Sequence, residues 1–354
     1  MSNLPPSGEI PRGAIRFNTD SNKPELWDGS QWAEFQLSTP NLGTSADTQP
    51  GARGIIGGGG GNVPSAFYRD SIEYVNISSS GNAQEFGDLN VARQYLGATA
   101  SSTRGVFSGG QTPSGLEKTM EFVTISSTGT VTDFGEDHSD LKYNSAGCGN
   151  QTRGLFGSGF IPGPFTPNNV IEYITIASTG NANDFGDLVT TSAQRGAFSS
   201  PVKGVWCGGY HPGNPYGQLD FVNIASTGNA QSFGDLVEDI VRVGGGSNAT
   251  RGVYFGGQSS PGGSRTGDVN YVTIATGGNA VHFGDLLATE EWPRMMSSST
   301  RGIVAGGSPG PYIGTYVIMQ QLNFSTQGDT VGFGDLTEGR TFGPGATSNA
   351  HGGL

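Results

Sequence analysis

The chain repeats itself with a period close to 50 residues, and this period limits its fold more than any other feature of the sequence. A basic residue followed by glycine recurs six times at spacings of 48 to 51 residues, at Arg53, Arg104, Arg153, Lys203, Arg251 and Arg301. A second motif, Phe-Gly-Asp-Leu, keeps pace with it and starts at Phe86, Phe185, Phe233, Phe283 and Phe333, with a degenerate copy at Phe134. Two motifs held in phase over six copies indicate a repeat architecture.

One period, residues 93–141, predicts four short strands. Residues 93–101 predict the first strand, and 104–110 predict a second strand that ends in a glycine pair. After a variable loop, the aromatic and β-branched run 120–126 predicts the third strand. A Ser-Thr-Gly turn follows, with Asn after the Gly in several copies, and these residues supply the positive φ that a tight hairpin needs. The fourth strand then runs into the Phe-Gly-Asp-Leu motif.

Four antiparallel strands in a period of about 50 residues are typical of a β-propeller blade. The order of basic residue, strand, glycine pair, variable loop and aromatic third strand resembles the kelch repeat. The glycine pairs that carry this resemblance are Gly109-Gly110, Gly208-Gly209, Gly256-Gly257 and Gly306-Gly307, followed by EFVTI, DFVNI, NYVTI and QLNFS. Kelch repeats usually have Trp in the fourth strand, where this chain has Phe. We expect an all-β fold, a six-bladed kelch-like β-propeller of four-stranded blades preceded by a small N-terminal β-hairpin module.

A propeller closes only when its two chain ends meet. The residues after the last motif match the start of other repeats in register, so we expect residues 337–354 to supply the first strand of the blade that begins at Arg53. Residues 41–51 compete for the same place. The predicted domains are residues 1–36, an attachment or oligomerisation hairpin, and residues 37–354, the propeller.

The repeated charged residues have a structural interpretation. A catalytic acid acts once or as a close pair, whereas these residues would lie one per blade around an axis. We expect each Asp to anchor a turn through backbone N–H groups, and each Arg to form a salt bridge within or between blades. The residues of this structural set are Arg53, Asp88, Arg104, Arg153, Asp187, Asp235, Arg251, Asp285, Arg301 and Asp335.

The loops between second and third strands are long, rich in Pro and aromatic residues, and differ from copy to copy. A rigid scaffold that carries divergent loops is typical of recognition. Exposed aromatic rings suit sugar faces or a protein partner, although these loops could instead pack on one another. The candidate binding residues are Phe67, Tyr68, Phe160, Phe165, Tyr210, His211, Tyr216, Tyr312 and Tyr316.

Residues 13–35 lie outside the repeat and predict two strands around a polar turn. Trp27 and Trp32 are too much apolar surface for an isolated hairpin in water, so we expect them to contribute to attachment. The order Gly, IRFNTD, Asp-Gly and Trp resembles a short module of bacteriophage tail-fibre and other virion proteins. The resemblance implies other virion proteins as partners and a homo-oligomer, for example a trimer.

Composition restricts the remaining possibilities. The net charge of −12 argues against nucleic acid or an anionic membrane as the main partner. No signal-peptide pattern and no apolar run of about 18 residues is visible, so we expect synthesis in a host cytoplasm, a location in the virion and no membrane insertion. Cys148 and Cys207 show no metal-ligand spacing, and the four histidines fall at different repeat phases. We therefore expect no metal and no cofactor.

These features favour a non-enzymatic virion protein of a bacteriophage, attached by its N-terminus. Its propeller would display loops for a host-surface glycan or a virion partner. The alternative is a propeller hydrolase that degrades glycans, which would need paired carboxylates in a pocket.

Overall fold

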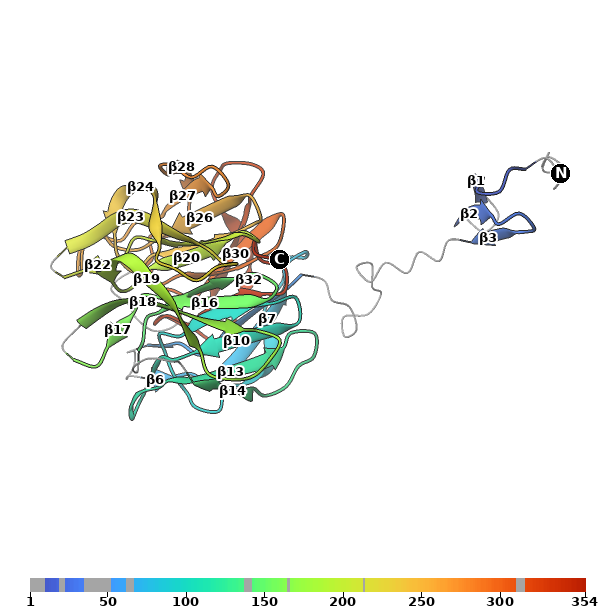
Figure 1. Ribbon diagram of the computed structural model, residues 1–354. Coiled ribbons are helices and arrows are strands. Elements are labelled where there is room, and N and C mark those ends of the chain that lie inside the picture. Colours follow the sequence, from blue (N-terminus) through green and yellow to red (C-terminus); the bar gives the residue numbers. More distant parts are fainter. Residues whose placement is uncertain are drawn as a thin grey trace. The chain divides into compact units, whose positions relative to one another are not determined.

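The computed structural model describes residues 10–18, 23–34, 52–61, 67–136, 142–163, 166–212, 214–309 and 316–354. These residues form β-strands joined by turns (Figure 1). No helix long and apolar enough to cross a membrane occurs among them. The chain divides into two compact units, residues 1–50 and 51–354.

The N-terminal unit contains an antiparallel sheet of β1 (Ile15–Asn18), β2 (Lys23–Trp27) and β3 (Trp32–Glu34), in that order. It fits the expected hairpin but has one strand more, because the chain turns again after Trp27. Asp28 Oδ1 accepts hydrogen bonds from the backbone N–H groups of Ser30 and Gln31 at 2.7 and 2.8 Å and so fixes this turn. The rings of Trp27 and Trp32, joined across the turn, lie 5.5 Å apart.

The second unit is a six-bladed β-propeller, as predicted. Each blade is an antiparallel sheet whose strands follow one another from the axis outward. The first blade in the chain consists of β33 (Gly345–Ser348), β4 (Arg53–Gly57), β7 (Ser71–Asn76) and β8 (Gln84–Asp88). The second consists of β9 (Gly97–Ala100), β10 (Arg104–Ser108), β13 (Thr119–Thr124) and β14 (Thr132–Glu136). The third consists of β15 (Ala146–Gly149), β16 (Arg153–Gly157), β18 (Thr166–Thr175) and β19 (Asn183–Ser192).

The other three blades repeat this order. The fourth consists of β20 (Gly196–Ser199), β21 (Lys203–Cys207), β23 (Asn214–Asn223) and β24 (Gln231–Ile240). The fifth consists of β25 (Gly244–Ser247), β26 (Arg251–Phe255), β27 (Asp268–Thr273) and β28 (Val281–Asp285). The sixth consists of β29 (Arg294–Ser297), β30 (Arg301–Ala305), β31 (Ile318–Asn323) and β32 (Val331–Asp335). Short ladders extend the second-to-third-strand loops: β5 (Gly60–Gly61), β6 (Phe67–Tyr68), β11 (Gln111–Thr112), β12 (Gly115–Leu116), β17 (Phe160–Ile161) and β22 (Tyr210–His211).

The two ends of the propeller meet in its first blade. β33, near the C-terminus, pairs with β4 in the register Ala346↔Ile56 and is the innermost strand of that sheet. The competing segment, residues 41–51, lies outside the described residues. The ring is therefore closed by backbone hydrogen bonds between residues almost 300 positions apart in the sequence.

The hydrophobic core lies between blades. Each buried cluster combines residues of two adjacent sheets, for example Ile55 and Ile72 of the first blade with Leu96 and Phe107 of the second. The Phe that begins each Phe-Gly-Asp-Leu motif is buried, and in five blades it packs edge-on against the aromatic residue of the third strand, as in the pair Tyr74 and Phe86 at 6.1 Å.

The Phe-Gly-Asp-Leu motif joins each blade to the next through its backbone. Gly129 N–H donates to Phe86 O at 2.8 Å and Val131 N–H to Asp88 O at 3.1 Å, and the same two bonds recur at every blade boundary. At four boundaries the Asp N–H also donates to a side-chain oxygen at the next hairpin tip, for example Asp187 to Asn229 Oδ1 at 3.1 Å. In these bonds the side chain of the tip residue is the acceptor and the Asp contributes only its backbone N–H, so the expected anchoring role belongs to the tip residue.

The basic residue at the start of each second strand bridges blades, but not as a salt bridge. Arg153 Nη1, for example, donates to Ile224 O in the next blade at 2.7 Å, and its guanidinium lies 4.5 Å from the Tyr173 ring centroid. Equivalent carbonyl bonds come from Arg53, Arg104, Lys203, Arg251 and Arg301. None of the six forms an ion pair within the described residues, so the expectation of salt bridges was wrong. The carbonyls that end each third strand are the acceptors instead.

Candidate functional site

Six equivalent residues surround the propeller axis where each blade begins. Each lies two positions before an innermost strand: Tyr95, Asn144, Gln194, Arg242, Trp292 and Gly343. All six have positive φ, between 45° and 64°. Five of them are not glycine, and this conformation costs a non-glycine residue about 1–2 kcal/mol. Strain repeated at one position of every blade is a marker of a functional site.

Local hydrogen bonds hold this conformation. In five blades the residue before the positive-φ position forms a β-bridge with the residue after the glycine that follows the second strand, as in Tyr143↔Phe160 and Glu291↔Ser308. Neighbouring blades are linked directly, since Asn144 N–H donates to Tyr95 O at 3.0 Å and Trp292 N–H to Arg242 O at 2.9 Å. Backbone hydrogen bonds therefore hold these six positions around the axis, and the side chains at these positions differ from blade to blade.

These side chains line a cavity on the axis, which we name the axial cup. Its volume is about 450 Å³, within the range of small-ligand sites. All six blades contribute to its lining, which consists of Tyr95, Gln111, Tyr143, Asn144, Phe160, Gln194, Arg242, Glu291, Trp292 and Phe342.

Aromatic rings form one continuous wall of the axial cup. Tyr95 is at its centre, with ring centroids 5.1 Å from Trp292, 5.8 Å from Phe342 and 6.0 Å from Tyr143. Tyr143 continues the wall to Phe160 at 5.3 Å. Burial raises the pKa of the Tyr95 and Tyr143 hydroxyls, so both remain neutral donors across the physiological pH range.

Polar groups complete the lining. Arg242 Nη1 donates to Gln258 Oε1 at 2.8 Å and to Glu291 Oε2 at 2.6 Å. Arg265 Nη2 donates to the other oxygen of Glu291 at 2.7 Å. Three buried polar atoms of lining residues have no hydrogen-bond partner among the described residues: Arg242 Nε, Gln194 Oε1 and Asn144 Oδ1. Buried polar atoms are rarely left unpaired, so these atoms are available to a ligand.

The axis narrows beneath the axial cup. Two spaces of about 40 and 50 Å³ are both lined by the second residue of each innermost strand: Ala98, Gly147, Ala197, Gly245, Met295 and Ala346. The C-terminal residues cross the far end, where His351 Nε2 lies 2.8 Å from Ala100 O. Burial lowers the pKa of this imidazole. The axial cup is therefore the largest of these three spaces along the axis.

Only some of the binding residues predicted from the loops lie at the axial cup. Phe160 lines the axial cup, and Tyr210 adjoins it with a ring separation of 5.9 Å. Phe67 lies under Arg69, Tyr216 packs beside Arg195, and Tyr316 lies close to the buried Glu290. The remaining described ones are Tyr68, in β6, and His211, whose Nδ1 is 2.9 Å from Thr191 O. Phe165 and Tyr312 lie outside the described residues.

Most residues of the axial cup were not predicted, because the second-to-third-strand loops supply only Gln111 and Phe160 of its described lining. The segments between blades emerge on the same face, and they supply Tyr95, Tyr143, Arg242, Trp292 and Phe342. One signal was available: the residue two positions before each first strand differs in every copy.

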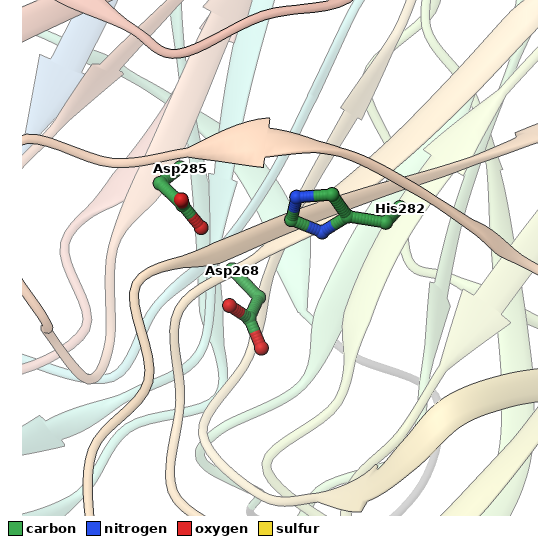
Figure 2. Close-up of side chains that lie close together, drawn as sticks. All are labelled: Asp268, His282 and Asp285. Atoms are coloured by element: carbon green, nitrogen blue, oxygen red, sulfur yellow. The ribbon is translucent and has the colours of Figure 1, made fainter.

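A separate group of potential metal ligands lies on the fifth blade. Asp268 on β27 and His282 and Asp285 on β28 each offer an atom within 4.8 Å of the others, and Figure 2 shows the imidazole beside both carboxylates. Sequence spacing did not reveal the group because Asp268 comes from the neighbouring strand. Since His282 and Asp285 are exposed, and such groups commonly gather without a metal, we assign it no role.

No protein-family model matches this chain, and no curated protein matches it. Fold and site therefore define the protein as a six-bladed β-propeller with an N-terminal β-sheet unit and an aromatic cup on its axis.

Proposed function

We propose that the protein is a non-enzymatic binding protein and that its axial cup holds a carbohydrate. The observation that carries this proposal is the combination of an aromatic wall with unpaired amide and guanidinium groups in one cavity. A sugar ring offers C–H groups to an aromatic face and hydroxyls to polar side chains, and a small-ligand site needs both kinds of contact.

Glycan hydrolysis is less well supported by the same cavity. A glycosidase uses two carboxyl groups about 5–9.5 Å apart. Glu291 is the one carboxylate among the described lining residues, and both of its oxygens accept hydrogen bonds from arginines. A carboxylate held in this way is a poor proton donor, which favours binding without turnover.

The N-terminal unit supports attachment to a bacteriophage virion. Its sheet has three strands of three to five residues, and a sheet this small is marginal in water unless it packs against something else. Trp27 is buried, 5% exposed, whereas Trp32 beside it is half-buried and leaves part of its ring accessible for such a contact. Several copies on one particle would present several axial cups to a host surface, so that weak single sites combine into strong attachment.

A glycan array on the full chain, followed by product analysis of every bound glycan, tests this function. Tyr143→Ala removes part of the aromatic wall and should weaken binding at least about tenfold, or 1.4 kcal/mol. Tyr216→Ala is the matched control, because Tyr216 is also half-buried but lies beside Arg195 outside the cup. Turnover would favour the hydrolase. Equal binding by both variants, or no bound glycan, would contradict the proposal.

A further inference from the structure

An arginine without an acidic partner lies directly beneath the axial cup. Arg294 begins β29, and its side chain lines the space of about 40 Å³ on the axis. The other lining residues of that space include Leu96 and Ser145, which follow the cup residues Tyr95 and Asn144 in the chain. The space is therefore the next layer down the axis.

The contacts of Arg294 do not balance its charge. Nη1 donates one hydrogen bond, to Pro293 O at 3.0 Å. Among the residues that the structure describes, no carboxylate is within ion-pair distance of Arg294. Burial lowers the pKa of its guanidinium to about 10, so the group is still charged at neutral pH.

Three fully buried arginines of the propeller are paired with carboxylates, unlike the half-buried Arg294. Arg93 contacts Glu121 at 2.5 Å, Arg195 contacts Asp220 at 2.5 Å, and Arg340 contacts Glu73 at 2.7 Å. Each of these pairs joins a blade to the segment before it and serves the fold. A half-buried guanidinium that lines an axial space and has no acidic partner among the described residues offers a binding group for an anion supplied from outside.

The wall of the axial cup adds to this positive charge. Arg242 and Arg265 share the single carboxylate of Glu291. Arg294, in the space beneath, adds a third guanidinium group, so that positive charge is in excess along this part of the axis in a protein whose net charge is −12. Burial raises the pKa of the neighbouring Glu290 well above its usual range, which favours the neutral form of this carboxyl.

We propose that the ligand of the axial cup is an acidic sugar, with a carboxylate held by Arg294 and Arg242 and a ring face packed on Tyr95 and Trp292. This inference rests on the proposed carbohydrate-binding function. Guanidinium groups bind carboxylates through two parallel hydrogen bonds, and Arg242 has its Nε free for such a contact. The local positive charge is what allows an anion to approach an otherwise acidic protein.

The test compares acidic sugars with neutral counterparts by isothermal titration calorimetry on the full chain. The probes are glucuronic acid, galacturonic acid and N-acetylneuraminic acid, set against glucose, galactose and N-acetylglucosamine. At least one acid should bind about tenfold or more tightly than every neutral sugar. Arg294→Met should reduce this preference to within about twofold, whereas Lys118→Gln, which removes one exposed positive charge away from the cup, should leave it unchanged.

Thermal unfolding separates a binding role from a structural one. If Arg294 serves a ligand, Arg294→Met should not lower the melting temperature of the ligand-free protein, because the substitution breaks no ion pair among the described residues. A lower melting temperature would overturn the inference. Equal binding of acidic and neutral sugars would overturn it and leave the carbohydrate function intact. Binding of none of the six would overturn it too, while the array decides independently whether the protein binds glycans.

Discussion

Closure of the propeller depends on one buried arginine at the seam between the chain ends. Arg340 has no exposed surface and donates five hydrogen bonds to Gly58, Ser71 and Glu73 in the first blade. Glu73 is 1% exposed and also accepts the Thr337 N–H at 2.7 Å. Arg340→Met would leave this carboxylate buried without its counter-charge. Removal of one partner of a buried ion pair costs about 3–5 kcal/mol, and we expect a loss of unfolding free energy in this range.

Urea unfolding followed by tryptophan fluorescence measures this loss, and a second substitution checks its cause. Glu73→Gln in the Arg340→Met background removes the stranded charge but keeps an acceptor for Thr337, so it should restore at least about 2 kcal/mol. Lys118→Gln, which breaks an exposed ion pair with Glu136, is the control and should not move the unfolding midpoint. A similarly small effect of Arg340→Met, or no recovery in the double variant, would refute the reasoning.

Three further predictions concern other parts of the chain. Burial raises the pKa of Glu290, so the contribution of this carboxyl to stability is present at low pH and is lost as pH rises above about 4.5 toward the folded-state pKa. Glu290→Gln, which keeps the hydrogen bond from Gln320, should therefore stabilise the protein at pH 8 and not at pH 4. The same gain at both pH values would contradict this. Cys148 and Cys207 are buried, and burial raises the pKa of both thiols, that of Cys207 to about 12. A thiol reagent should therefore react with them only in denaturant. Rapid labelling of the native protein would contradict the packing of these side chains in the core. Deletion of residues 1–36 should leave a folded propeller by circular dichroism that no longer incorporates into particles, and normal incorporation would exclude an attachment role for the N-terminal unit.

The fold could be predicted because its determinants repeat along the chain. Each Phe-Gly-Asp-Leu motif places a Phe between two sheets, and each glycine pair supplies positive φ after a second strand, as at Gly109 and Gly110 with φ of 62° and 107°. These are local requirements, so the same residues return about every 50 positions. The number of blades and the strands of each blade follow directly from them.

Roles that depend on a neighbouring blade could not be predicted in the same way. The sequence shows that Arg153 recurs in phase, but not that its nearest acceptor is a carbonyl of the next blade rather than a carboxylate. The axial cup is harder still, because Tyr95, Arg242 and Trp292 are separated by about 50 to 200 residues and share no residue type. These residues share only their position two residues before a first strand, and the sequence does not show that these positions meet at the propeller axis.

A crystal structure of the full chain with the glycan that binds best on the array tests the central claim most directly. The account predicts a sugar in the axial cup, with a ring face on Tyr95 or Trp292 and polar groups on Arg242, Gln194 or Asn144. A sugar bound at a blade edge or in the outer loops, with the axial cup unchanged, would contradict it.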